Sequence, residues 1–273
     1  MAYRINNSIY TGVTLILVTG HQRSGTTLLG KLFFSHPEMA VTHEFSNLMF
    51  LNQPLTNYMR AMLAYTNSVK AQFGFLPQIE NPRHIRWQNM LFTLRYLYHV
   101  MRVTRGVVDF SVIERALHRT FPNKTIVGDK LPQYSKQLHR FAGNDHVTCV
   151  VIYRDCRDVA SSFLIKTQTD WADQPWVKKW DSTGKIAQRW VERIEHMEKW
   201  ADQVFLIRYE TLVTEPEQVL PQLAAKLNVD SGGFDVNMVD PGSIGNYRKK
   251  LTDREVADIM AVAGPTMARL GYV

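Results

Sequence analysis

The sequence has few cysteines and no long apolar segment. Its two cysteines, Cys149 and Cys156, lack the spacing of metal ligands, which favours a reducing compartment. No stretch approaches the ~20 apolar residues that a membrane-spanning helix needs, and residues 1–7 are too polar to begin a signal peptide. We therefore expect a cytoplasmic protein with no stable membrane association.

The sequence also lacks a continuous basic tract, although its net charge is +7. This excess of positive charge suggests anionic ligands, and a basic surface without a partner accounts for much of the same excess. Because the cations are not gathered into a tail or a run, nucleic acid is not the expected partner. A chain of 273 residues can bury one large core, so we predict a single domain over residues 1–273.

Apolar runs at residues 13–18, 124–127, 146–153 and 204–209 alternate with stretches of helical periodicity. The alternation predicts an α/β fold with a central parallel sheet and helices on both faces. Residues 48–120 differ, because Met, Leu and aromatic residues recur there at helical spacing. We interpret this segment as a helical insertion whose inner face forms a substrate pocket, while a layer that only covers the sheet is the alternative. Five of its apolar residues share one helix face: Trp87, Leu91, Leu94, Tyr98 and Met101.

The most informative segment is residues 20–27, with the sequence GHQRSGTT. It lies between the apolar run 13–18, typical of a buried parallel strand, and residues 28–33, whose apolar positions have helical spacing. A phosphate-binding loop has this strand-loop-helix context, because a helix N-terminus presents free N–H groups and the positive end of its dipole. A simple tight turn is the alternative, and the flanking elements favour the phosphate site.

The loop departs from the usual nucleotide-binding pattern at one position. Its spacing follows G-x-x-x-x-G-K-[ST] at Gly20, Gly25 and Thr27, but Thr26 replaces the lysine. The loop therefore keeps its backbone cradle and loses the charge that reaches a terminal phosphate. Its own cation is Arg23.

A second candidate phosphate site follows the apolar run at 147–152, where residues 153–158 have the sequence YRDCRD. Ligands of open α/β sheets bind beyond the carboxyl ends of the strands, so Arg154 is expected at the same edge as the glycine loop. Ser162 follows about two helical turns later. An arginine and a serine hydroxyl can together hold a phosphate.

These motifs resemble those of the sulfotransferases that use 3′-phosphoadenosine 5′-phosphosulfate (PAPS) and release PAP. The first motif of that family is similar to RSGTTL at residues 23–28, followed by His36-Pro37, and the second is similar to residues 153–162. Residues 208–216 resemble a late strand and helix of many bacterial members, and residues 243–249 resemble their C-terminal loop, which closes over the cofactor. The resemblance covers nearly the whole chain except residues 48–120, where such enzymes vary with the acceptor.

The resemblance implies a set of cofactor-binding residues, and this set requires no metal because its second site is itself cationic. The set is Gln22, Arg23, Ser24, Gly25, Thr26, Thr27, Arg154, Ser162, Tyr209, Ser243, Tyr247, Arg248 and Lys249. Arginine at position 23 is more similar to the tyrosylprotein sulfotransferases and many bacterial enzymes than to the cytosolic steroid and phenol sulfotransferases, which usually carry lysine there.

Sulfuryl transfer needs an anion cradle, a cation on the departing oxygen and a base for the acceptor proton, by analogy with phosphoryl transfer. Arg23 can bridge phosphate and sulfate. The resemblance to tyrosylprotein sulfotransferases, which have a lysine before a proline at a similar place, implies that Lys130 stabilises the transition state. A solvated surface lysine is the alternative.

Two neighbours, His43 and Glu44, compete for the role of base. Because neighbours on a strand point to opposite faces, we expect only one of them to face the cofactor. Histidine has a reference pKa of ~6.5, nearer neutrality than the ~4.3 of glutamate. Glu44 has the offset from Arg23 at which tyrosylprotein sulfotransferases place their catalytic glutamate, and we favour it.

The expected acceptor is a small molecule or natural product with hydroxyl or amine groups, as in secondary metabolism, bound by a monomer or homodimer. Residues 48–120 and a loop from residues 168–182 are expected to line its pocket. A peptide tyrosine, a glycan and a lipid head group are alternative acceptors.

Two other functions remain open at this point. A P-loop kinase or nucleotide hydrolase with a degenerate loop could use Asp155 for magnesium, but it has no role for Arg154 and Ser162. A non-catalytic PAP-binding protein would keep both phosphate sites without the transfer chemistry.

Overall fold

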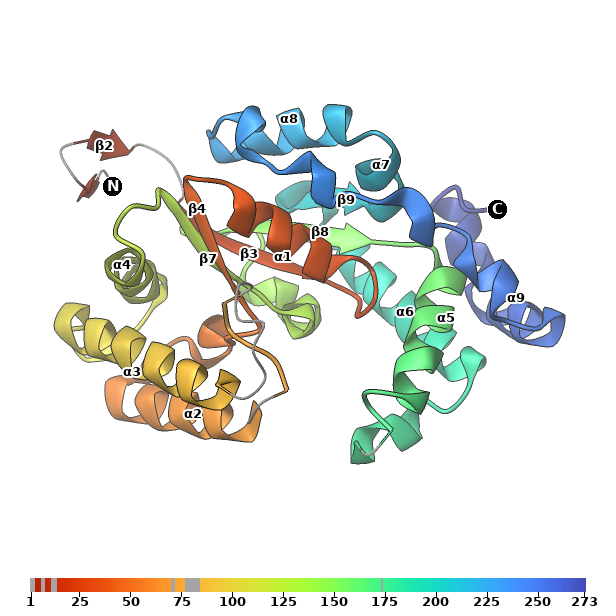
Figure 1. Ribbon diagram of the computed structural model, residues 1–273, viewed down its shortest axis with the longest axis horizontal. Helices are drawn as coiled ribbons and strands as arrows, with labels where there is room; N and C mark the ends of the chain where they lie inside the picture. Colours follow the sequence, from red (N-terminus) through yellow and green to blue (C-terminus); the bar gives the residue numbers. More distant parts are fainter. Residues whose placement is uncertain (1–2, 6–7, 11–13, 70–71, 77–83, 173) are drawn as a thin grey trace.

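The computed structural model describes residues 3–5, 8–10, 14–69, 72–76, 84–172 and 174–273. At its centre is a five-stranded sheet in the order β4-β7-β3-β8-β9 (Figure 1), and every neighbouring pair is parallel. The strands are β3 (Leu15–Gly20), β4 (Met39–His43), β7 (Ile126–Lys130), β8 (Thr148–Tyr153) and β9 (Phe205–Arg208). The prediction of an α/β fold with a parallel sheet is confirmed.

Strand β3 is apolar along its length because both of its faces are covered. Ile16 and Val18 pack on one side with α1 (Thr26–Ser35), α7 (Tyr209–Thr214) and α8 (Pro216–Leu227). Leu15 and Leu17 pack on the other side with α2 (Leu55–Val69), α3 (Ile85–Val103) and α4 (Phe110–Thr120). The predicted run 13–18 is displaced by two residues in the structure, and Val13 lies outside the described residues.

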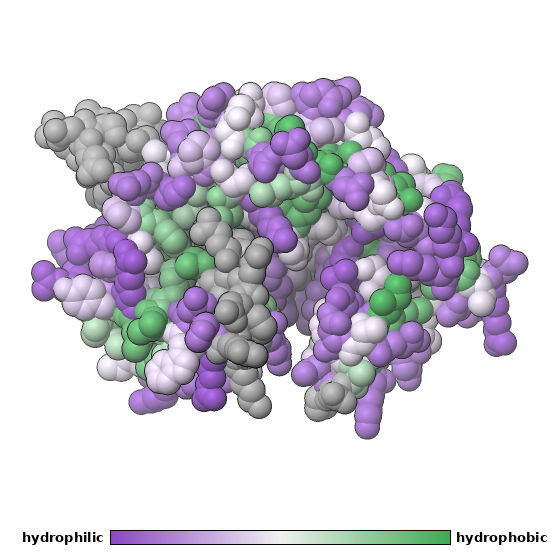
Figure 2. Space-filling model, viewed as in Figure 1, coloured by the Kyte–Doolittle hydropathy of each residue, from purple (hydrophilic) through white to green (hydrophobic). Residues whose placement is uncertain are grey.

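A third group of helices covers β8 and completes the core. Val151 packs with α5 (Cys156–Gln168), α6 (Thr183–Glu198) and α9 (Asp253–Arg269). In Figure 1 the lobe of α2–α4 lies at the lower left of the view and the lobe of α5, α6 and α9 at the right. Figure 2 shows the surface hollowed between these lobes, with hydrophilic residues facing the hollow.

Side-chain caps fix where several helices begin. Asp109 accepts a hydrogen bond from the amide of Val112 at the start of α4, and Ser182 accepts one from the amide of Lys185 at the start of α6. Thr252 and Glu255 form a reciprocal capping box at the start of α9. These local contacts satisfy amides that have no partner within the helix.

The remaining elements are short. They are the strands β1 (Tyr3–Ile5), β2 (Ser8–Tyr10), β5 (Gln53–Pro54) and β6 (Val107–Val108), and the 3₁₀ turns η1 (Asn47–Phe50), η2 (Pro132–Arg140), η3 (Pro175–Lys179), η4 (Ala201–Gln203), η5 (Ser231–Gly233), η6 (Val236–Met238), η7 (Pro241–Ser243) and η8 (Asn246–Lys249). No helix in the described ranges is long and apolar enough to span a membrane.

The expected orientation of α3 is wrong. The face from Trp87 to Met101, predicted to point inward, is exposed to solvent. The opposite face is buried although it carries Asn89 and Thr93, because their polar groups find partners. Asn89 accepts a hydrogen bond from the amide of Phe75, and the Thr93 hydroxyl bonds that of Thr66. Burial of a polar residue is tolerated when its hydrogen bonds are made, so the apolar stripe did not identify the core face.

Candidate active site

A cavity of about 300 Å³ opens beyond the carboxyl ends of the central strands. It is lined by Arg23, Gly25, Thr26, Thr27, Leu28, Arg154, Asp158, Ser161, Ser162, Tyr209, Ser243, Asn246 and Lys250. The strand register pairs Gly20 at the end of β3 with Ile152 near the end of β8, which places the loop after each strand on the same edge of the sheet. Two motifs far apart in the sequence therefore line one cavity.

The glycine loop leads directly into α1, whose first residue is Thr26. Gly25 has a left-handed φ of 97°, and a Cβ there would collide with the ring of Tyr209, so glycine is required at this position. The first-turn amides of α1 have no partners within the helix and lie beside the cavity. This geometry suits an anionic group at the helix N-terminus.

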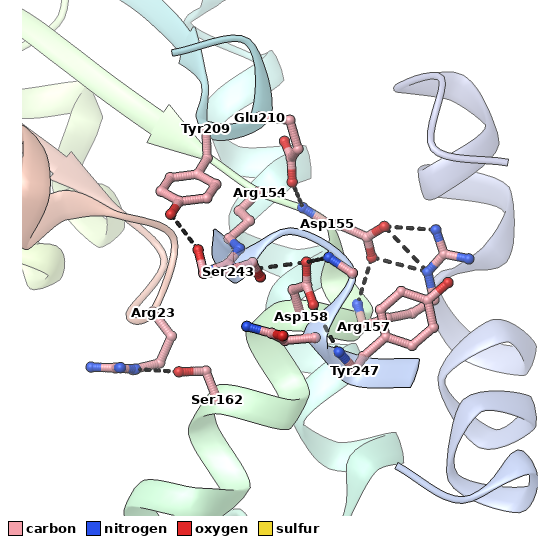
Figure 3. Close-up of polar contacts among 12 residues, drawn as sticks. Arg23, Arg154, Asp155, Arg157, Asp158, Ser162, Tyr209, Glu210, Ser243 and Tyr247 are labelled. Carbon is pink, nitrogen blue, oxygen red and sulfur yellow. Dashed lines mark hydrogen bonds and ion pairs between the residues drawn. The ribbon is translucent and has the colours of Figure 1, made fainter. Parts of the chain in front are cut away.

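Arg23 and Ser162 connect the two motifs. Arg23 Nε donates a hydrogen bond of 2.9 Å to Ser162 Oγ (Figure 3). Burial, followed by repulsion from the nearby Arg154, lowers the pKa of the Arg23 guanidinium. Two cations held close together in a partly buried cavity favour an anion between them.

Arg154 is buried at the end of β8 and fixed on several sides. Its guanidinium lies over the ring of Tyr209, 4.3 Å from the centroid, and Nη2 donates a 2.5 Å hydrogen bond to the carbonyl of Ser243. Nη2 also lies 3.4 Å from a carboxylate oxygen of Asp158. Its Nε is buried and has no hydrogen-bond partner among the described residues.

The C-terminal segment closes this side of the cavity. Asp158 accepts hydrogen bonds from the amides of Gly245 and Tyr247, at 2.8 and 3.0 Å, and the hydroxyls of Tyr209 and Ser243 are 2.5 Å apart. Figure 3 shows these contacts converging from β8, α5, α7 and the segment before α9. The carboxylate of Asp158 thus ties the C-terminal loop to the first turn of α5.

Tyr247 does not line the cavity and packs instead against Arg157. The guanidinium of Arg157 lies over its ring, 4.6 Å from the centroid, and also forms an ion pair of 2.6 Å with Asp155. The backbone amide of Asp155 donates to Glu210, which joins the start of α5 to α7. Figure 3 shows this group beside the cavity contacts, so it supports Arg154 without lining the cavity.

A second polar cluster lies at the ends of β4 and β7. Lys130 is fully buried, and its Nζ donates a 2.8 Å hydrogen bond to Glu44 Oε1. His43 Nε2 lies 3.3 Å from the same Nζ. The Lys130 side chain passes Gly30 on α1, one turn beyond the residues that line the cavity. We refer to His43, Glu44 and Lys130 as the transfer cluster.

The expectation that His43 and Glu44 point to opposite faces of a strand is wrong. Glu44 has a left-handed φ of 54°, so the strand alternation ends at His43 and both side chains reach Lys130. The amide of Glu44 donates to the carbonyl of Lys130, which fixes this turn against β7.

Asp129 holds the same turn from the opposite face of the sheet. Its buried carboxylate accepts hydrogen bonds from the Thr42 hydroxyl, the amides of Phe45 and Ser46, and the Tyr134 hydroxyl, at 2.6 to 3.0 Å. Burial raises the pKa of Asp129, and these four donors act in the opposite direction. The carboxylate therefore fixes the backbone that carries Glu44.

The electrostatics of the transfer cluster keep His43 neutral at physiological pH. Burial, and then the charge of Lys130, lowers the pKa of His43 to about 4. Burial also lowers the pKa of Lys130, whereas the attraction of Glu44 opposes that shift. A lysine and a glutamate in contact, with a neutral imidazole beside them, can move a proton with little reorganisation.

The structure brings together most of the residues singled out from the sequence. Arg23, Gly25, Thr26, Thr27, Arg154, Ser162, Tyr209 and Ser243 line the cavity. Gln22, Ser24, Tyr247, Arg248 and Lys249 are not among its lining residues, while Asp158, Ser161, Asn246 and Lys250 are and were missed. The spacing of the second motif could have identified Asp158 and Ser161, which precede Ser162 on α5. In the described part of the chain, no group of three or more His, Cys, Asp or Glu side chains could hold a metal ion.

Comparison with known proteins gives a family and a fold. A sequence model described as "Sulfotransferase family" matches residues 16–231, which is more than half of the chain. The structure of the sulfotransferase domain from the Synechococcus PCC 7002 olefin synthase aligns with a TM-score of 0.57 and 15% identity, over 97% of this chain and 98% of that one. The sulfotransferase domain from the curacin biosynthetic pathway aligns with a TM-score of 0.54 and 13% identity, over 96% and 98%. Among curated proteins no sequence matches.

Proposed function

The chain belongs to the sulfotransferase family, and from that premise we propose that it transfers a sulfuryl group from PAPS to a hydroxyl or amine of a small-molecule acceptor. Enzymes of this family use PAPS as the donor. The observation that carries the proposal is that one cavity joins the first turn of α1 to Arg154 and Ser162, which provides two anion sites in one space.

The residues of the cavity fit the two charged ends of PAPS. The amides and hydroxyls of Thr26 and Thr27 would hold the phosphosulfate, and Arg23 would bind across both of its anionic groups. Arg154 and Ser162, which both line the cavity, would hold the 3′-phosphate. When bound, PAPS supplies the sulfuryl group.

We assign the proton transfer to Glu44. Its Oε1 is held by Lys130, and within the described residues its Oε2 accepts no hydrogen bond, so Oε2 can receive the proton of an acceptor hydroxyl. The ammonium of Lys130 would stabilise negative charge that develops on the departing oxygen. His43 remains neutral beside this pair and is the competing base.

The acceptor would lie beside Tyr65 and Phe73 rather than against the Trp87 face of α3. Tyr65 of α2 donates a 2.7 Å hydrogen bond to the carbonyl of Glu44, and the ring of Phe73 packs against that of His43. The segment 48–120 thus borders the transfer cluster through these two aromatic residues. Within that segment, residues 70–71 and 77–83 lie outside the described residues, as does residue 173 of the proposed 168–182 wall.

The proposal is tested by offering PAPS with a labelled sulfuryl group and a panel of hydroxyl- and amine-bearing small molecules. We expect label to appear on an acceptor in step with PAP release. Transfer to peptide tyrosines or glycans in place of small molecules would revise the acceptor class. PAP binding without transfer to any class would leave only a PAP-binding protein.

A ligand comparison separates the proposal from a kinase or nucleotide hydrolase. PAP should raise the melting temperature increasingly as its concentration exceeds its Kd, whereas ATP with magnesium should raise it much less. Equal stabilisation by both would contradict the 3′-phosphate assignment. We further propose a cytoplasmic enzyme, a location that its two buried free cysteines support.

A further inference from the structure

The exposed face of α3 is unlike the rest of the surface of its lobe. Five large apolar side chains project from it, and each is between 45% and 71% exposed: Trp87, Leu91, Leu94, Tyr98 and Met101. They recur at alternating steps of four and three residues, the spacing of a seam between two packed helices. At 100° per residue they fall within about 80° of the helix circumference, a narrow stripe. Figure 2 shows apolar residues among hydrophilic ones on this lobe.

The stripe has positive charge on its flanks and no negative charge on its own helix. Arg86, Arg95 and Arg102 are exposed, and α3 contains no Asp or Glu. Arg86 and Arg102 form no ion pair with any described residue, while Arg95 donates to the carbonyl of Thr120. Burial lowers the pKa of the nearby His99, and Arg95 and Arg119 lower it further, which agrees with a cationic surrounding.

We propose that this face of α3 is a docking surface for an acidic amphipathic helix of a partner protein. The four-three spacing provides a seam for a second helix, and the arginines complement a partner whose own apolar seam is flanked by Asp or Glu. Trp, Tyr and Arg are also the residues that most often anchor protein interfaces. The inference goes beyond the proposed sulfuryl transfer and does not depend on it.

Charge selects this occupant over the alternatives. A second copy of the chain would bring Arg86, Arg95 and Arg102 against the same arginines, because a two-fold interface places one surface against itself. An anionic membrane would match the charge, but it does not require a stripe as narrow as a helix-packing seam. A helix of opposite charge satisfies both the spacing and the arginines.

The test uses three labelled synthetic peptides of about three heptads. The first has leucines at four-three spacing flanked by glutamates, the second has lysines in place of the glutamates, and the third is a scrambled version of the first. Binding to the full-length protein is measured by fluorescence anisotropy. We expect the acidic amphipathic peptide to bind at least about tenfold more tightly than the other two.

Two variants locate the binding. The double variant Arg86→Glu and Arg102→Glu should weaken the acidic peptide by about tenfold or more and strengthen the lysine peptide, a charge exchange that unfolding cannot imitate. The double variant Leu91→Gln and Leu94→Gln should weaken both amphipathic peptides. The matched control is Arg254→Glu, an exposed arginine on α9, which should change neither affinity.

Four results would overturn the proposal. One is equal binding of the acidic and scrambled peptides, and another is an acidic-peptide affinity that the arginine reversal leaves unchanged. The third is binding to phosphatidylglycerol vesicles, lost in the Leu91→Gln and Leu94→Gln variant, without any peptide binding, which would assign the face to a membrane. The fourth is a dimer in sedimentation that the same leucine variant abolishes, which would assign the face to a second copy.

Discussion

The nucleotide cavity and the transfer cluster lie at the same edge of the sheet, but they are built from different chemistry. The cavity is lined mainly by arginine side chains, hydroxyl groups and the amides of a helix N-terminus, and Arg154 is held there by a carbonyl and an aromatic ring. The transfer cluster consists of three titratable side chains within 4 Å of one another. The cavity suits the binding of an anion, whereas neighbouring titratable side chains suit proton transfer. Mutations in the cavity should therefore change PAP affinity, and mutations in the transfer cluster should change kcat.

The largest expected effect is that of Glu44→Gln. The amide keeps the contact with Lys130 but cannot accept the acceptor proton, so kcat should fall by ~10²–10⁴ with PAP affinity nearly unchanged. His43→Gln is the matched comparison and should cost less. Steady-state kinetics and PAP titration of both variants check this, and a larger loss in His43→Gln would move the role of base to His43.

Lys130→Met should also lower kcat, by ~10²–10³, because it removes a charge aimed at the departing oxygen. It fills similar space, so the buried position remains packed. PAP affinity, measured on the same preparation, should change little. An unchanged kcat would make Lys130 a structural residue.

The transfer cluster should also make stability depend on pH through His43. The folded pKa of His43 is about 4, below the 6.5 of an unfolded histidine, so the unfolded chain binds more protons between these values. Stability therefore falls as pH drops from 6.5 towards 4, by roughly 3 kcal/mol from this group. Denaturant unfolding of wild type and His43→Gln should show a shallower acid dependence in the variant. An equal acid dependence in both proteins would contradict the lowered pKa of His43.

In the cavity, Arg154→Ala should weaken PAP by about 10- to 100-fold, equivalent to roughly 1.5–3 kcal/mol for a charge-assisted contact. The kcat at saturating PAPS should remain close to that of wild type. Adenosine 5′-phosphosulfate, which lacks the 3′-phosphate, should be affected far less. Equal weakening of both nucleotides would place Arg154 away from the 3′-phosphate.

The smallest expected effect concerns two cationic residues of the C-terminal loop, Lys250 and Arg248. Lys250 lines the cavity, whereas Arg248 lies outside its lining. Because Lys250 is exposed, Lys250→Ala should weaken PAP by only a few-fold. Arg248→Ala should have less effect, and the reverse order in calorimetric titration would show that the loop closes differently around the cofactor.

Much of the cavity was predictable because its determinants are local in sequence. The strand before residues 20–27, the glycines and the helix after them specify a phosphate loop, and the strand end at Arg154 specifies the second site. The C-terminal loop was expected to close over the cofactor, but the residues of it that line the cavity, Asn246 and Lys250, were not predicted, because their positions depend on Asp158 binding the amides of this distant loop. Contacts of that kind leave no periodic pattern.

The transfer cluster and α3 show where local patterns failed. The left-handed backbone of Glu44 is uncommon for a residue other than glycine, and it is held by Asp129 from another strand. In α3, the buried face contains Asn89 and Thr93, whose partners come from elsewhere in the fold. In both cases tertiary hydrogen bonds decided an orientation that spacing alone predicted wrongly.

The most direct test of the separation between binding and transfer is a single-turnover measurement with labelled PAPS and an identified acceptor. Wild type, Glu44→Gln and Arg154→Ala are compared, with the PAP affinity of each measured on the same preparation. We predict that Glu44→Gln binds PAP normally and transfers the sulfuryl group at least about a hundredfold more slowly, while Arg154→Ala binds PAP weakly and transfers at nearly the wild-type rate once saturated. Loss of both binding and transfer in both variants would contradict the division of the site into an anion-binding cavity and a proton-transfer cluster.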